Sequence, residues 1–124
     1  MNTMLWVLQI VLAVVFALAG MAKIALPRER LSTTMGDWVD AVPAPAVKLL
    51  GVAEVAAAVG LTVPPSMAIM PILTPLAAIG VIAVMAGAIV THGRRREYPN
   101  VAVNVMLAVA AGVVIWGRFG PYAF

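Results

Sequence analysis

The chain has 124 residues, of which 64% are hydrophobic and 10% are charged, and its mean hydropathy is +1.06. Soluble domains are about 45–50% apolar and about 25% charged, so this composition predicts an integral membrane protein. The chain has no cysteine and a single histidine, which excludes disulfides, thiolate chemistry and metal sites built from several Cys or His residues. The formal charge of +3 rests on eight Lys and Arg residues, and we interpret it as a topology signal and not as nucleic-acid binding.

The first apolar stretch, residues 4–26, is interrupted only by Gln9 and Lys23 and is closed by Pro27. About 20 residues suffice to cross the bilayer core, so this stretch predicts a membrane span. The sequence Ala17-Leu18-Ala19 resembles a signal-peptide cleavage site. We prefer the span, because the N-terminus carries no basic residue and the apolar run continues past that point.

The following segment, residues 27–45, is the longest polar stretch of the chain. Its middle, residues 31–42, predicts a short amphipathic helix at the membrane interface, because its apolar residues recur at helical spacing. These apolar residues are Leu31, Met35, Trp38 and Val42. Trp38 is of the type that settles at the level of the lipid head groups.

Prolines bound the next two spans. The second covers residues 46–63 and is predicted to end at Pro64-Pro65, because proline lacks the N–H group that continues a helix. The third covers residues 75–92, with Thr74 as its N-cap and Pro75 at its first helical position.

A basic loop, residues 93–100, leads to the fourth span, residues 101–118. The four spans predict a single membrane domain over residues 1–124. We therefore expect an all-α integral membrane protein: a four-transmembrane-helix bundle with an interfacial segment between helices 1 and 2.

The basic residues lie almost entirely on one side of this bundle. Loops 27–45 and 93–100 must share one face of the membrane, because two spans separate them. With their flanks they hold seven of the eight basic residues: Lys23, Arg28, Arg30, Lys48, Arg94, Arg95 and Arg96. The positive-inside rule predicts that both loops are cytoplasmic and that both termini lie outside.

Glu54 is the most unusual residue of the chain, because it lies inside the apolar run 49–61. A carboxylate in the bilayer costs about 2.5–3.5 kcal/mol on insertion scales. At a rise of 1.5 Å per residue, Glu54 lies about 9 Å beyond Lys48, too deep to reach the interface. Its side chain must therefore be paired, protonated or solvated in a cavity, and it is a candidate site residue.

Each of the other spans carries one polar residue at a comparable depth: Lys23, His92 and Asn104. One inward residue from each helix of a four-helix bundle makes a single cluster, so we expect these three residues to meet Glu54. Small residues three or four positions apart accompany each polar residue and predict that it lies on or beside a packing face. They are Ala13, Ala17 and Gly20; Gly51 and Ala58; Ala83, Gly87 and Ala88; and Ala108 and Gly112.

Three of the four polar residues also have a simpler interpretation. Lys23 can extend to the cytoplasmic interface, and His92, beside Gly93, can be an ordinary loop residue. Asn104 can form a hydrogen bond between helices without any chemistry. For Glu54 such a simpler interpretation is the weakest of the four, because its side chain lies too deep to reach the interface.

Several short motifs resemble the DoxX / DoxX-like family of small four-helix membrane proteins. Ala19-Gly20-Met21-Ala22-Lys23 resembles the A-G-x-x-K element of that family, and Gly51-Val52-Ala53-Glu54 resembles its G-x-x-E element. Trp38 and Asn104 match its loop tryptophan and its fourth-helix asparagine, and Met85-Ala86-Gly87-Ala88 leading to His92 is similar to its third-helix pattern. The order and spacing of these motifs cover essentially the whole chain.

The resemblance implies a multi-pass protein of the bacterial plasma (inner) membrane with a quinone-linked or redox-partner role. The family includes subunits related to thiosulfate:quinone oxidoreductase and membrane partners of redox enzymes. Because this chain has no cysteine, direct sulfur transfer by its own residues is not expected.

Our first hypothesis is a redox-associated membrane component with a polar pocket that opens toward the cytoplasmic side. Glu54 and His92 would transfer protons, and Lys23 would hold or polarise an oxygen of a lipophilic substrate. The substrate-binding candidates are Asn104, Trp38, Gly51 and Gly20. The sequence names no cofactor, and a quinone is the candidate; no metal site is expected.

The second hypothesis is a non-catalytic membrane partner or assembly protein, in which the polar cluster only fixes helix packing. A small carrier or channel is a third, but four short helices leave little lumen unless the chain oligomerises. The expected partners are the lipid bilayer, a lipophilic small molecule or quinone, and a redox enzyme or a second copy of the chain. The sequence leaves open whether the chain is itself an enzyme.

Overall fold

The computed structural model describes residues 2–67, 69–70 and 72–122, and this part of the chain is helical throughout apart from its connections. The elements are α1 (Asn2–Ala25), α2 (Arg28–Met35), the 3-10 helix η1 (Asp37–Ala41), α3 (Ala44–Ser66), α4 (Leu73–Arg94) and α5 (Tyr98–Phe119). Helices α1, α3, α4 and α5 are each long and apolar enough to cross a membrane. The predicted four-helix membrane bundle is confirmed, and α2 and η1 occupy the segment between the first two spans.

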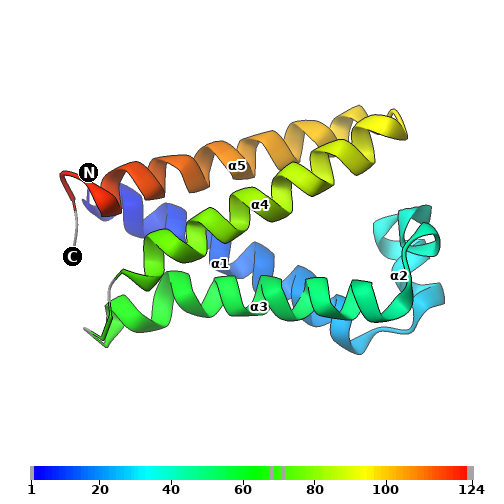
Figure 1. The fold of residues 1–124 in the computed structure, drawn as a ribbon, viewed down its shortest axis with the longest axis horizontal. Helices are drawn as coiled ribbons and strands as arrows, with labels where there is room; N and C mark the ends of the chain where they lie inside the picture. The colour runs from blue at the N-terminus through cyan, green and yellow to red at the C-terminus, as the bar shows by residue number, and fades with distance from the viewer. Residues whose placement is uncertain (1, 68, 71, 123–124) are drawn as a thin grey trace.

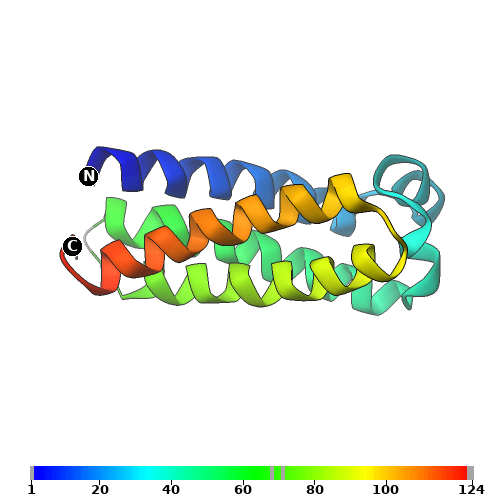
Figure 2. The same cartoon turned by 90° about the horizontal axis from the view of Figure 1, so that it is seen from above.

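The long helices form two pairs, α1 with α3 and α4 with α5 (Figure 1). Both termini lie at one end of the bundle, which we call the terminal end (Figure 2). There the pairs meet, since Gly117 of α5 lies against Leu5 of α1, and Gly60 of α3 lies against Ala77 of α4. Toward the other end, the loop end, where α2, η1 and the α4–α5 turn lie, the pairs move apart (Figure 1).

The α1–α3 pair is held close by two glycines. An added Cβ on Gly20 would lie 2.6 Å from the backbone oxygen of Gly51, and one on Gly51 would lie 2.7 Å from that of Gly20. Only glycine permits so close a crossing of two membrane helices. The predicted packing role of these small residues therefore holds for α1 and α3, where Ala13 and Ala58 are also buried.

The same prediction holds only in part for α4 and α5, where Ala88 and Ala108 pack against the buried core. An added Cβ on Gly87 or Gly112 would meet no described atom within 4 Å, and Ala83 and Gly87 are exposed. Helix α4 buries a different face, which carries Val81 and Met85. A stripe of small residues permits close packing, but it does not require that a neighbouring helix lies there.

Helix α3 runs through Pro64 and Pro65 to Ser66, so the predicted end at the prolines is wrong. A proline within a helix leaves the carbonyl four residues earlier without its N–H donor. Here those carbonyls belong to Gly60 and Leu61. The helix can continue only where other groups supply these two hydrogen bonds.

Two polar side chains from other helices supply them. Thr74 Oγ1 donates to the carbonyl of Gly60 (3.2 Å), and Gln9 Nε2 donates to that of Leu61 (2.7 Å). Thr74 therefore does not cap α4 as predicted: the helix begins at Leu73, and Thr74 lies in its first turn and bonds to α3.

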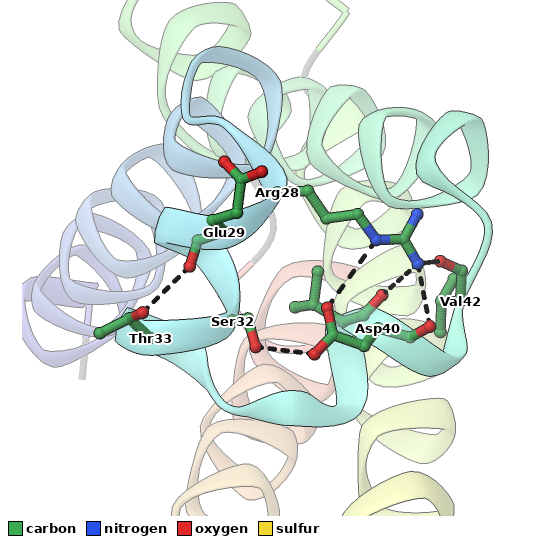
Figure 3. Close-up of polar contacts among 7 residues, drawn as sticks. Arg28, Glu29, Ser32, Thr33, Asp40 and Val42 are labelled. Carbon is green, nitrogen blue, oxygen red and sulfur yellow. Dashed lines mark hydrogen bonds and ion pairs between the residues drawn. The ribbon is translucent and has the colours of Figure 1, made fainter.

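The segment between α1 and α3 is folded by one arginine. Arg28 Nη2 lies within hydrogen-bond distance of the carbonyls of Val39 (3.0 Å), Asp40 (3.0 Å) and Val42 (2.6 Å). Figure 3 shows the guanidinium beside Asp40 and Val42. Ser32 Oγ also donates to Asp40 Oδ2 (2.9 Å), which ties α2 to η1.

The predicted single helix over residues 31–42 is wrong, because the chain breaks at Gly36, whose φ of 110° favours glycine. The predicted apolar face nevertheless forms. Leu31, Val39 and Val47 make a small buried cluster, and Met35, Trp38 and Val42 pack against it. This cluster seats α2 and η1 on the loop end of α1 and α3.

The glycine crossing predicts opposite effects for two identical substitutions. Gly20→Ala should lower the free energy of unfolding by about 1–3 kcal/mol, because the methyl group must displace the α3 backbone. Gly80→Ala is the matched control: its Cβ meets no described atom within 4 Å, so it should raise stability by about 0.5–1 kcal/mol. Thermal unfolding of detergent-solubilised protein measures both, and shifts of the same sign would contradict the close crossing.

The proline arrangement predicts a coupling between α1 and α3. Gln9→Leu should lower stability by about 1–3 kcal/mol, because it removes the donor to the Leu61 carbonyl. Pro65→Ala restores a backbone N–H for that carbonyl, so it should recover more stability in the Gln9→Leu background than in wild type. A double-mutant cycle measures the difference, and strict additivity would show that Gln9 does not serve this carbonyl.

Candidate functional site

A cavity of about 600 Å³ lies among the four long helices and η1, at the loop end where the pairs have separated. Its wall is mainly apolar and includes Phe16, Leu50 and Leu107. All four polar candidates line it, together with the predicted tryptophan: Lys23, Glu54, His92, Asn104 and Trp38. The expected residues therefore line one space, but of the three expected to meet Glu54 only Lys23 forms an ion pair with it.

Lys23 and Glu54 form an ion pair with Nζ and Oε1 2.6 Å apart, and their side chains are only 8% and 4% exposed. Lys23 turns into the bundle and not toward the interface. Its ammonium also lies 5.9 Å from the centre of the Trp38 ring, within the range of cation–π attraction.

The direction of the two helices explains this pairing. A side chain leaves a helix tilted toward the helix N-terminus. Helices α1 and α3 run in opposite directions, with Lys23 on the loop side of the glycine crossing and Glu54 on the terminal side. Both side chains therefore lean toward the crossing and toward each other.

His92 pairs with Glu97, which sequence reasoning missed. His92 Nδ1 lies 2.7 Å from Glu97 Oε1 at the α4–α5 turn, and the Glu97 backbone N–H donates to the His92 carbonyl (2.9 Å). The His92 ring also meets the Trp38 ring edge to face, with centroids 6.2 Å apart. At this end Lys23 pairs with Glu54, His92 and Arg95 both lie against Glu97, and Arg28 pairs with Asp40. Glu97 could have been found from its place five residues after His92, within one tight turn.

Asn104 differs from the other cluster members. It is nine-tenths buried in α5 and lines the cavity, yet its Nδ2 has no hydrogen-bond partner in the described part of the chain. A buried donor without a partner costs about 1–3 kcal/mol, and native structures contain few of them. Asn104 therefore combines a place in the cavity lining with a buried amide nitrogen that has no partner in the described part of the chain.

The remaining candidates divide into two kinds. Trp38 lines the cavity, and its Nε1 donates to the Met35 carbonyl (3.1 Å), which fixes the indole over the loop end. Gly20 and Gly51 lie outside the cavity lining, at the helix crossing. Their contribution is to set the position of Lys23 and Glu54.

A second buried polar group lies at the terminal end and was not predicted. Arg118, only 4% exposed, donates from Nε to Gln9 Oε1 (2.8 Å) and from Nη1 to Asn2 Oδ1 (2.7 Å) and the Tyr122 carbonyl (2.8 Å). The sequence signal was present, since Gln9 and Arg118 are polar residues in the terminal-end halves of the first and fourth spans. This group joins α1 to α5 far from the cavity, and we assign it to packing.

The described residues contain no group of three acidic or histidine side chains that could hold a metal ion. The cavity instead combines apolar walls, one unpartnered amide and one buried ion pair. That combination suits a flat apolar molecule with hydrogen-bond acceptors.

Comparison with known proteins adds one finding. The model of the DoxX-like family matches residues 7–114, which include every polar residue of the cavity lining. No curated protein and no solved structure matches the chain.

The buried ion pair predicts a rescue. Glu54→Gln should destabilise the protein by about 3–5 kcal/mol, because it leaves the Lys23 ammonium without a counter-charge in an apolar environment. Adding Lys23→Met should restore most of the loss, because an apolar pair of similar volume can replace a buried ion pair. Chemical unfolding in detergent measures the three variants. Losses that simply add would mean that the two groups do not interact.

Proposed function

The chain belongs to the DoxX-like family, and we propose that its cavity binds a lipophilic carbonyl compound of the quinone class, as part of a redox-associated membrane component. The unpartnered amide of Asn104 carries this proposal. A quinone has a flat apolar ring, which suits the cavity wall, and carbonyl oxygens that can accept a hydrogen bond from Nδ2.

The other polar residues have complementary roles in this proposal. Lys23 holds and polarises a ligand oxygen, while Glu54 balances its charge across the 2.6 Å contact. Glu54 and His92 are the proton-holding groups of the cavity lining, and His92 is positioned by Glu97. The electrons would be exchanged with a partner redox enzyme.

We further propose a bacterial plasma membrane location with the loop end on the cytoplasmic side and both termini outside. The support is the basic bias: α2, the start of α3 and the α4–α5 turn carry most of the Lys and Arg residues, and Arg94, Arg95 and Arg96 are exposed. The protein would then meet its ligand from the cytoplasmic leaflet.

A non-catalytic partner or assembly role is the second candidate, and one observation favours it. The Lys23–Glu54 pair is closed, buried and set beside the glycine crossing, as expected of a device that fixes helix register. The amide of Asn104 argues for the ligand, because a cluster that served packing alone would have given this donor a partner.

Asn104→Leu separates the two functions, because it should change stability and binding in opposite directions. It removes an unpartnered buried donor, so the ligand-free protein should become more stable, by about 1–3 kcal/mol. It also removes the hydrogen bond to the ligand, so the Kd for a ubiquinone analogue should rise about tenfold. Tryptophan fluorescence quenching in lipid nanodiscs measures the Kd.

Asn100→Leu, the same change at an exposed position of the same helix, is the control and should alter neither quantity appreciably. Wild-type protein that binds no quinone, or a Kd unaffected by Asn104→Leu, would leave the assembly role as the function.

A further inference from the structure

We propose that the ligand is an amphiphile with a long hydrocarbon tail, and that the tail leaves the cavity through the lipid-facing side of α4 at Ala83 and Gly87. This inference rests on the proposed function and specifies the ligand and its route. The polar head lies at Lys23 and Asn104, and the tail extends into the bilayer.

The exposed face of α4 locates the opening. Leu76, Ile79 and Val90 are 48%, 45% and 52% exposed, and their spacing marks the stripe of α4 that faces lipid. Ala83 and Gly87 continue this stripe at four-residue steps, and both are exposed. Both also line the cavity. The cavity therefore reaches the lipid-facing surface of the helix at these two residues.

Small side chains keep the opening of the cavity at Ala83 and Gly87 wide. An added Cβ on Gly87 would meet no described atom within 4 Å, and Ala83 contributes only a methyl group. The loop end of the cavity, in contrast, is covered by Trp38, whose ring meets that of His92. At Ala83 and Gly87 the cavity lining thus carries no large side chain.

The volume of the cavity limits how much of a tailed ligand fits inside, and the rest must leave through the opening at Ala83 and Gly87. Pockets of about 300–1,000 Å³ enclose drug-sized molecules, so the cavity of about 600 Å³ holds a head group with the beginning of a tail. A long prenyl or alkyl chain does not fit inside. Leaving along α4 keeps the rest of that chain in an apolar medium, with no transfer to water.

The test uses two ligands, a ubiquinone head group with a decyl tail and the same head group without a tail. Gly87→Leu should raise the Kd of the tailed quinone about tenfold, because a branched side chain then occupies the tail route, and should change the Kd of the tail-less quinone less than about twofold. Ala83→Leu, one turn away on the same stripe, is a second variant with the same expectation.

Gly112→Leu is the matched control, because Gly112 has equally open surroundings but lies outside the cavity lining. It should change neither Kd. Thermal unfolding checks that all variants remain folded.

The outcomes distinguish this inference from the function on which it rests. A selective loss of the tailed ligand supports the route along α4. Equal losses of both ligands, or no loss of either, overturn the route while the quinone site stands. Wild-type protein that binds neither ligand overturns the site and the route together.

Discussion

The close approach of α1 and α3 at Gly20 and Gly51 determines the geometry of the loop end. Because the helices are antiparallel and their side chains tilt toward each N-terminus, this crossing directs Lys23 and Glu54 at each other. Two charges that would be costly alone in a bilayer are then compensated within one helix pair. The pair needs nothing from α4 or α5 for its main charges, so the second pair can stand away from it and leave a cavity.

The terminal end shows the opposite arrangement, in which polar groups draw the pairs together. Gln9 of α1 accepts from Arg118 of α5 and donates to the α3 carbonyl of Leu61, which Pro65 has deprived of its donor. Thr74 makes the corresponding bond from α4 to Gly60. The bundle is therefore joined at one end by hydrogen bonds across both pairs and is separated at the other. This asymmetry positions a cavity in one half of the molecule.

The spans and the members of the polar cluster could be predicted because their physical causes are local. Hydropathy and length define a span, and the insertion cost of a charge identifies Glu54 without knowledge of the fold. The hydrogen-bond partners of Gln9 could not be predicted, because its contacts with Leu61 and Arg118 depend on how α1 crosses α3 and α5. The predicted end of the second span at Pro64-Pro65 was wrong for the same reason: the groups that donate to the freed α3 carbonyls come from α1 and α4.

Asn104 separates a ligand site from a packing cluster, because two features of the loop end oppose close packing. The helix pairs leave about 600 Å³ between them, and the lining of that space includes Asn104, whose buried amide nitrogen has no hydrogen-bond partner in the described chain. The empty space and the unpartnered amide would each lower stability. If the two helix pairs closed together, the space would disappear and the amide would gain neighbouring groups. A bundle shaped for packing alone would have closed. A ligand with an apolar ring and a carbonyl oxygen would relieve both features at once, and this is the physical reason for proposing that the space binds one.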